Sequence, residues 1–383
     1  MSQLHADVSI AQLSKVGEEL CGDKIVVTHT KEGTIIVLSD GLGSGVKANI
    51  LATLTTKIAS SMLKRGIPLA DVVSTIADTL PVCRQRKIAY STLHILKVAS
   101  SGLVTVVEFD CPTSFLIRDG KVQPFQLTEK VISGKLIKEG QLLLRENDLI
   151  VAVSDGIIHA GIGGLLKLGW GWKGIADQLQ SIARQDCSAS YISDNIIRCT
   201  EGYYLGQPGD DSTIVTVKMR KTRRLTILTG PPVDRRFDEK LVKRFLSQPG
   251  KKVVAGGTTA HIVSKVCNRP LKMDISSYSE YIPPMGHIEG VDLVTEGILT
   301  LNAVLECITN HRNERGCLER NGANLLAEML LEADKIDIYA GKSTNPAHHN
   351  PSFPFKINVK PQVLAKLQAV LESKGKEVSI EWF

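Results

Sequence analysis

Carboxylates stand at the ends of apolar runs in three distant parts of the chain. They are Asp40 after the run 34–38, Asp155 after the run 148–153, and Asp211 before the run 213–217. Apolar runs of this length are typical of buried strands. Mg²⁺ and Mn²⁺ prefer oxygen ligands and suit phosphate chemistry. The pattern therefore predicts that the three carboxylates converge on one hard-cation site.

Each of these motifs also has a simpler interpretation as a turn. Asp-Gly is a common turn dipeptide, and both Asp40 and Asp155 are followed by glycine. After Asp40 we expect Gly41 to allow a sharp turn of the backbone. The chemical interpretation therefore rests on the ordered set of motifs and not on any one of them.

The ordered set resembles the metal-dependent protein phosphatases of the PPM family, in particular the SpoIIE/RsbU branch, over about residues 10 to 220. The stretches that carry the resemblance are Cys21-Gly22-Asp23, Ser39-Asp40-Gly41-Leu42-Gly43-Ser44-Gly45, Ser114-Phe115-Leu116-Ile117-Arg118-Asp119-Gly120, Ser154-Asp155-Gly156 and Gly209-Asp210-Asp211-Ser212-Thr213. The resemblance implies an enzyme of signal transduction that hydrolyses phosphoserine or phosphothreonine. Its substrate would be a phosphorylated regulatory protein of the anti-sigma-antagonist type.

The resemblance also implies a metal site with two divalent ions, Mn²⁺ or Mg²⁺, about 3.5–4 Å apart and sharing a water or hydroxide. Asp40 would bridge the ions, the carbonyl of Gly41 would bind one of them, and Asp155 and Asp211 would hold the other. Asp23 would lie near the metals. The shared hydroxide would attack phosphorus in line while the metals offset charge on the phosphoryl oxygens. No covalent enzyme intermediate is needed.

Two assisting groups of the eukaryotic relatives, a phosphate-binding arginine and a general-acid histidine, have no convincing match in this sequence. His159 closely follows Asp155, but a lone histidine at such a place is more simply a loop residue. The proton for the leaving serine oxygen would then come from metal-bound water.

The predicted elements before residue 222 are short strands interrupted by two helix pairs, 44–65 with 68–80 and 172–183 with 189–205. In the first helix, apolar residues recur every four positions and predict one buried stripe; they are Val46, Ile50, Leu54, Ile58 and Met62. The resemblance implies an α-β-β-α sandwich of two antiparallel sheets flanked by helices over residues 1–221. In the SpoIIE branch the helices equivalent to 44–80 are implicated in switching activity.

Beyond Arg224 the pattern changes to alternating strands and helices, which predicts a smaller α/β domain over residues 225–383 with a mostly parallel sheet. The strands are expected at 225–228, 252–255, 336–339 and 378–382, and the helices at 238–246, around 262–266, and at 291–308, 323–333 and 361–373. We expect this domain to be regulatory or to bind a small ligand or a protein partner.

One segment of the second domain suits an anion. Gly256-Gly257-Thr258-Thr259 lies between a predicted strand and a predicted helix, where backbone amides can cradle a phosphate or carboxylate. A tight turn with a threonine cap is the simpler interpretation. The sequence does not decide whether the polar segments 285–290 and His348-His349 line the same cleft.

Composition narrows the class of protein. The 383 residues are 43% hydrophobic and 22% charged, which is ordinary for a globular protein of two domains. The net charge of +6 is spread out, without the basic run that would indicate nucleic acid, and no stretch approaches the ~20 apolar residues of a membrane span. The N-terminus lacks a signal pattern. We expect a cytoplasmic protein, and a homodimer is compatible with the sequence.

The eight cysteines form no Cys-x-x-Cys pair, so we interpret them as reduced thiols and not as a zinc site. Two rival functions remain open. The chain is either a metal-dependent hydrolase of small phosphate esters, with the second domain binding the substrate, or an inactive regulator with a phosphatase fold. Retention of Asp40, Asp155 and Asp211 argues against the inactive regulator.

Overall fold

The computed structural model describes residues 4–30, 32–79, 91–274, 283–309, 321–343 and 359–383. The chain divides into two compact units, Met1–Lys221 and Thr222–Phe383, and each is described by itself. Among the described residues, no helix is both long and apolar enough to cross a bilayer.

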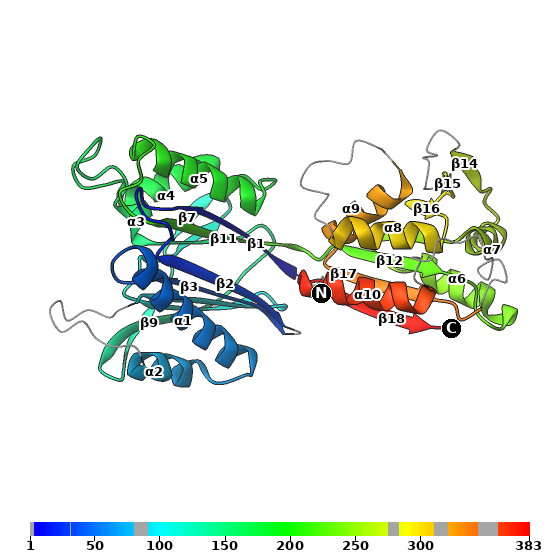
Figure 1. The fold of residues 1–383 in the computed structure, drawn as a ribbon, viewed down its shortest axis with the longest axis horizontal. Helices are drawn as coiled ribbons and strands as arrows, with labels where there is room; N and C mark the ends of the chain where they lie inside the picture. The colour runs from blue at the N-terminus through cyan, green and yellow to red at the C-terminus, as the bar shows by residue number, and fades with distance from the viewer. Residues whose placement is uncertain (1–3, 31, 80–90, 275–282, 310–320, 344–358) are drawn as a thin grey trace. The chain divides into compact units, whose positions relative to one another are not determined.

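Unit 1 stacks two antiparallel sheets between two helix pairs, as Figure 1 shows. One sheet has the order β1 (Leu4–Leu13), β11 (Ser212–Lys221), β10 (Leu149–Val153), β6 (Phe115–Arg118), β7 (Lys121–Gln123). The other has the order β2 (Asp23–Thr30), β3 (Gly33–Asp40), β4 (Leu93–Ala99), β5 (Leu103–Phe109), β9 (Lys135–Leu143), β8 (Thr128–Ile132). The helices are α1 (Gly45–Lys64), α2 (Leu69–Thr79), the short α3 (Asp155–Ile158), α4 (Gly171–Ile182) and α5 (Ala189–Tyr203). The predicted sandwich is confirmed.

Three apolar layers hold unit 1 together. Ile36, Leu96 and Ile150 belong to the buried layer between the two sheets. A second layer, which includes Leu179, packs α4 and α5 on the β1–β7 sheet, and a third, which includes Val73, packs α1 and α2 on the other sheet. Strand β10 is buried throughout, and β3 is buried at every residue except its first and last, so both lead from the interior to the residues that follow them.

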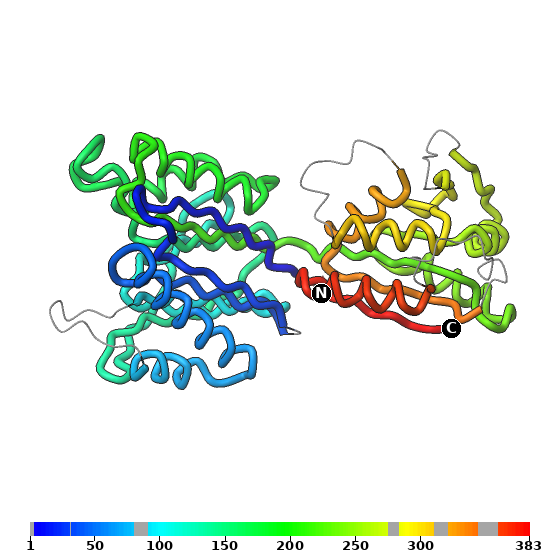
Figure 2. The backbone as a smooth tube through the Cα atoms, viewed as in Figure 1, coloured from blue at the N-terminus to red at the C-terminus, as the bar shows by residue number. Residues whose placement is uncertain are grey.

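The N-terminal strand β1 was not among the predicted elements. It pairs along its whole length with β11, from Leu4 opposite Lys221 to Leu13 opposite Ser212. Figure 2 shows the two strands side by side. Its apolar residues alternate with polar ones from Leu4 to Ile10. This alternation with a period of two is typical of a half-buried strand and could have predicted β1.

The predicted apolar stripe of α1 is wrong for its N-terminal half, because Val46, Ile50 and Leu54 are 53%, 59% and 46% exposed. The buried face carries mostly small residues, among them Ala48 and Ala52, which are fully buried. The helix backbone lies so close to the sheet that large side chains fit only beside the contact. A spacing of four also drifts around a helix of 3.6 residues per turn.

Unit 2 contains one seven-stranded sheet. Its order is β14 (Lys272–Asp274), β15 (Met285–His287), β16 (Leu293–Thr295), β13 (Lys251–Ala255), β12 (Arg224–Thr229), β17 (Lys335–Ala340), β18 (Glu377–Trp382). The five strands from β16 to β18 are parallel. The helices are η1 (Arg235–Phe237), α6 (Asp238–Leu246), α7 (Gly257–Cys267), α8 (Ile298–Thr309), α9 (Gly322–Glu332) and α10 (Lys360–Ser373). The mostly parallel sheet is confirmed.

Helices cover both faces of the unit 2 sheet. One apolar core joins the sheet to α6 and α7, and the other joins it to α8, α9 and α10. The helix expected at 291–308 begins only at Ile298, because 293–295 forms β16. Short aliphatic runs do not distinguish a buried strand from a helix. Part of the polar segment 285–290 is strand β15, and His348-His349 lie outside the described residues.

Candidate metal centre of unit 1

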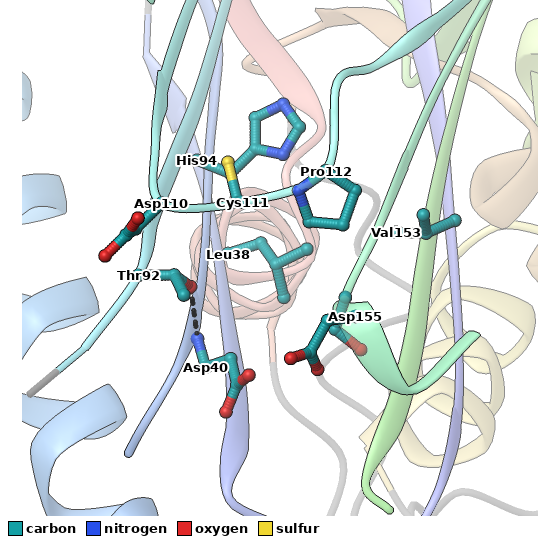
Figure 3. A pocket seen from close by; sticks show the side chains of 10 residues that line it. Leu38, Asp40, Thr92, His94, Asp110, Cys111, Pro112, Val153 and Asp155 are labelled. Atoms are coloured by element: carbon teal, nitrogen blue, oxygen red, sulfur yellow. Dashed lines mark hydrogen bonds between the residues drawn. The ribbon is translucent and has the colours of Figure 1, made fainter. Parts of the chain in front are cut away.

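Asp40 is the last residue of β3, and the neighbouring strand region fixes its backbone. The Asp40 amide donates to Oγ1 of Thr92 at 2.9 Å, and the Thr92 amide donates to the Asp40 carbonyl at 2.8 Å. Figure 3 shows the first of these bonds. The side chain of Asp40 is therefore presented from a rigid strand end.

Asp155 comes from the other sheet. It follows β10 as the first residue of α3, and Ser154 holds the adjacent backbone by accepting a hydrogen bond from the Thr213 amide at 2.9 Å. In Figure 3 the carboxylates of Asp40 and Asp155 turn toward each other from the two sheets. Both line one pocket, together with Leu38, Thr92, His94, Asp110, Cys111, Pro112, Val153 and Ser154.

Asp23 is the cross-strand partner of Asp40, at the start of β2. Its side chain is 2% exposed, and neither carboxylate oxygen has a hydrogen-bond partner among the described residues. A buried carboxylate without partners costs free energy. A cation bound beside Asp23 would offset this cost.

The two aspartates of the 209–212 segment have different surroundings. Asp211 is buried, and each of its carboxylate oxygens accepts from a backbone amide, Oδ1 from Lys15 at 2.9 Å and Oδ2 from Gly22 at 2.8 Å. These bonds tie Asp211 to the connection between β1 and β2, which is almost 200 residues away in the chain. Asp210 is half-buried, and its charge acts on Asp40 and Asp155. The structure therefore brings Asp210 into the cluster, which the sequence analysis did not select.

The carboxylates repel one another, and the pKa values show it. Burial, followed by repulsion from Asp23, Asp155 and Asp210, raises the pKa of Asp40 to about 9. Burial, with repulsion from Asp211 and Asp155, raises the pKa of Asp23 to about 7, although the nearby hydroxyls of Thr213 and Ser154 offset part of this shift. Burial and Asp155 also raise the pKa of Asp210. A cation would relieve this repulsion directly.

Gly41 is needed for a reason other than the expected sharp turn. A Cβ atom at this position would lie 2.0 Å from the carbonyl oxygen of Ala48, in the first turns of α1. A Cβ atom at Gly22 would lie 2.9 Å from Cβ of Ala48. Helix α1 therefore packs its backbone directly on Gly41, next to Asp40.

A buried polar network surrounds His94, which is one of the residues that line the pocket. Ser114 donates to Oε1 of Glu108 through its amide and its hydroxyl, both at 2.7 Å, and lies 2.8 Å from Nε2 of His94. Because the hydroxyl proton points to Glu108, Nε2–H of His94 donates to Ser114. Burial lowers the pKa of His94, which keeps the ring neutral near pH 7. His94 lies inside the apolar strand β4, so its local sequence carries no signal of a functional role.

Tyr204 is a second residue that the sequence analysis missed. Its hydroxyl donates to the carbonyl of Gly156 at 2.7 Å, so it braces the turn that carries Asp155. Burial and the neighbouring Asp210 raise the pKa of Tyr204 to about 12. No local sequence pattern distinguishes this tyrosine from its neighbour Tyr203.

The chemistry of the cluster fits a hard divalent cation. Asp23, Asp40, Asp155 and Asp210 offer only oxygen donors, which Mg²⁺ and Mn²⁺ prefer, and the oxygens of Asp23 lack partners among the described residues. As placed, however, no three His, Cys, Asp or Glu side chains in the described part of the chain are gathered closely enough to hold an ion. The ligand roles predicted from the sequence all stay predictions; they concern Asp23, Asp40, Gly41, Asp155 and Asp211.

Known proteins share this fold. The family described as Stage II sporulation protein E (SpoIIE) matches residues 30–220. The protein named Stage II sporulation protein E of Priestia megaterium is 24% identical over 221 residues, which are 56% of this chain and 36% of that protein. The chain therefore spans only about a third of the length of this curated relative.

Two solved structures are also similar. The PP2C phosphatase domain of SpoIIE from Bacillus subtilis, solved with a fragment of its regulatory domain, has a TM-score of 0.50 and 21% identity, over 58% of this chain and 64% of that one. RsbX in complex with magnesium has a TM-score of 0.42 and 19% identity, over 57% of this chain and 100% of that one. Unit 1, with its two sheets and its strand-end aspartates, is a SpoIIE-type domain of the PPM phosphatase class.

Proposed function

We propose that unit 1 is an active, metal-dependent serine/threonine phosphatase that removes phosphate from a regulatory protein. The observation that carries the proposal is the convergence of Asp40 and Asp155 from two different sheets on one pocket. Asp23, the cross-strand partner of Asp40, is buried beside them and has no hydrogen-bond partner among the described residues. Mutually repelling buried carboxylates with raised pKa values are typical of functional sites, which favours an active enzyme over an inactive regulator.

Asp40, Asp155 and Asp210 would hold the metal, with Asp23 opposite Asp40 on the neighbouring strand. When bound, Mn²⁺ or Mg²⁺ acidifies a water and offsets negative charge on the phosphoryl oxygens. Asp211 would not bind the metal itself. Its bonds to the amides of Lys15 and Gly22 would hold the loop that presents Asp210. The bonds between Thr92 and Asp40 fix the other side of the site.

The family favours a phosphoprotein as the substrate, and we infer a small phosphorylated regulator of the anti-sigma-antagonist type. The rival function is the hydrolysis of a small phosphate ester, with unit 2 supplying the substrate site. All the proposed ligands lie in unit 1, which favours a phosphoprotein because such a substrate needs no pocket in unit 2.

The test is hydrolysis by the full chain with Mn²⁺, first of an aryl phosphate, then of phosphoserine and phosphothreonine peptides, and finally of a panel of phosphorylated metabolites. Activity on the peptides that disappears with EDTA and with Asp155→Asn supports the proposal. Activity confined to one metabolite would favour the rival function. A chain that is inert at saturating Mn²⁺ towards every substrate would indicate the inactive regulator.

A further inference from the structure

We propose that unit 2 binds the phosphate group of a small molecule at the carboxyl edge of its parallel sheet, where the loops after β12 and β13 meet the first residue of α10. This site is separate from the carboxylates of unit 1. It is built from the backbone amides of Gly230 and of the first turn of α7, from the hydroxyl of Thr259, and from the ammonium group of Lys360.

The topology places these groups at the position where such sheets bind ligands. The parallel strands lie in the order β16, β13, β12, β17, β18. After β12 the chain adds β13 and β16 on one side of β12, and it then adds β17 and β18 on the other side. In open α/β sheets, ligands bind outside the carboxyl ends of the strands where the order reverses. Gly230 follows β12, and Gly341 follows β17, at this point of reversal.

Helix α7 begins at this edge with free donors. The amides of Gly257, Thr258 and Thr259 precede the first complete turn and have no acceptor within the helix. No described side chain caps them, and the residue before the helix is Gly256, with φ of 136°. The 11 residues of α7 are enough to direct a partial positive charge at its N-terminus, which favours an anion.

A second observation, independent of the helix terminus, points to a ligand. Thr259 is 2% exposed, and its Oγ1 has no hydrogen-bond partner among the described residues. This oxygen would lie 3.1 Å from a Cβ atom added to Gly256, so it is directed at the space beside that glycine. Oγ1 of Thr295, at the end of the adjacent strand β16, is also buried and unpartnered in the described residues.

Lys360 supplies a full positive charge. Its Nζ donates to the carbonyls of Gly341 at 3.1 Å and Ser343 at 3.4 Å, and it forms no ion pair with a described carboxylate. Partial burial lowers the pKa of Lys360, because the ammonium group loses water without gaining a counter-charge. An anion would supply that counter-charge.

The glycines bring these groups together. A Cβ atom on Gly230 would lie 2.2 Å from Nζ of Lys360, and a Cβ atom on Gly256 would lie 4.0 Å from the amide nitrogen of Gly230. Lys360, Gly230, Gly256 and Thr259 thus form one continuous row. Several amide donors with one ammonium group match the three acceptor oxygens of a phosphate better than the two of a carboxylate.

The test is isothermal titration calorimetry of the full chain in EDTA, so that no divalent metal draws phosphate to unit 1. Inorganic phosphate, adenosine monophosphate and acetate are titrated separately. We expect saturable one-to-one binding of phosphate or of the nucleotide, at least tenfold tighter than any binding of acetate. Tighter binding of the nucleotide would identify a phosphate monoester as the ligand, and tighter binding of phosphate would identify the free ion.

Three variants locate the site. Lys360→Gln should weaken binding at least tenfold, and Thr259→Val, which keeps the shape of the side chain, should weaken it several-fold. Lys240→Gln, at an exposed lysine of α6, is the matched control and should bind as the wild type does. Thermal unfolding confirms that each variant is folded. No saturable binding of phosphate or nucleotide, equal binding of acetate, or unchanged binding by both Lys360→Gln and Thr259→Val would overturn the proposal.

Discussion

Asp23 and Asp40 face each other across the β2–β3 pair, at the end of the sheet where the metal centre is proposed. Two carboxylates so placed repel each other wherever both are ionised. Burial, reinforced by this repulsion and that of neighbouring carboxylates, raises the pKa of Asp40 to about 9 and that of Asp23 to about 7. The pair therefore links folding to pH.

The first prediction concerns stability in EDTA. Unfolded aspartate has a pKa near 4, so from about pH 4 to pH 9 the folded protein binds more protons than the unfolded chain. The free energy of unfolding should then be largest near pH 4 and fall as the pH rises through 7 towards 9. Urea unfolding at pH 5 and pH 8 measures this decline.

Asp40→Asn should remove part of the decline and raise the thermal midpoint at pH 8 by about 2–4 °C for each kcal/mol gained. Asp177→Asn, at an exposed carboxylate in the middle of α4, is the control and should leave the pH profile as it is. A wild-type protein that is equally stable at both pH values would show that the two aspartates ionise normally.

The second prediction separates the neighbouring aspartates Asp210 and Asp211. Asp210→Asn should reduce Mn²⁺-dependent hydrolysis of an aryl phosphate by at least 10²-fold and leave the thermal midpoint within a few degrees of the wild type. Asp211→Asn should destabilise the fold by about 1–3 kcal/mol, because one buried amide then faces an NH₂ group in place of an oxygen.

Activity and thermal unfolding are measured on both variants. The predicted outcome is a folded, inactive Asp210→Asn and an Asp211→Asn that loses stability first. If Asp211→Asn were inactive but as stable as the wild type, and Asp210→Asn fully active, then Asp211 would be the ligand, as the sequence motif predicts.

The third prediction concerns the contact between Gly41 and α1. Gly41→Ala would place a methyl group 2.0 Å from the Ala48 carbonyl oxygen, so the helix must move. We expect a loss of about 1–3 kcal/mol in stability and a higher Mn²⁺ concentration for half-maximal activity. Gly202→Ala in α5 is the control, because its Cβ atom would meet nothing within 4 Å. A Gly41→Ala variant with wild-type stability and Mn²⁺ dependence would contradict the proposed role of this contact.

The fourth prediction concerns the two units. The proposed carboxylates and the three apolar layers around them all lie in residues 1–221, so this fragment should fold alone and keep basal phosphatase activity. If unit 2 acts on the helix pair α1–α2, deleting it should shift the Mn²⁺ dependence of activity as well as the rate.

The measurement is a Mn²⁺ titration of activity for the full chain and for the fragment 1–221, made side by side. Coincident midpoints with different rates would mean that unit 2 recruits substrate and does not act through the metal site. An insoluble fragment, or one that does not respond to metal, would support the rival function in which unit 2 takes part in the chemistry.

Much of the fold was predictable because its signals are local. Buried strands such as β3 and β10 are apolar runs followed by Ser-Asp-Gly, and their order with the helix pairs fits the sandwich that the family resemblance implies. The burial of α1 was not predictable, because it depends on how closely Ala48 approaches Gly41, and no local pattern encodes that distance. The sequence also does not show which of Asp210 and Asp211 is free to bind a metal. That depends on the amides of Lys15 and Gly22, which hold Asp211 and lie almost 200 residues away.

Between α1 and the residue after β3, main chain meets main chain, because the three atoms nearest to a Cβ on Gly41 would be the backbone O, C and Cα of Ala48. Side chains can change rotamer to absorb a displacement, but peptide planes cannot. A movement of α1 towards the sheet should therefore displace Gly41 and the peptide bond between Asp40 and Gly41 by nearly the same distance. The helix and the end of the strand are thus rigidly coupled, so the position of α1 determines the position of the backbone beside Asp40.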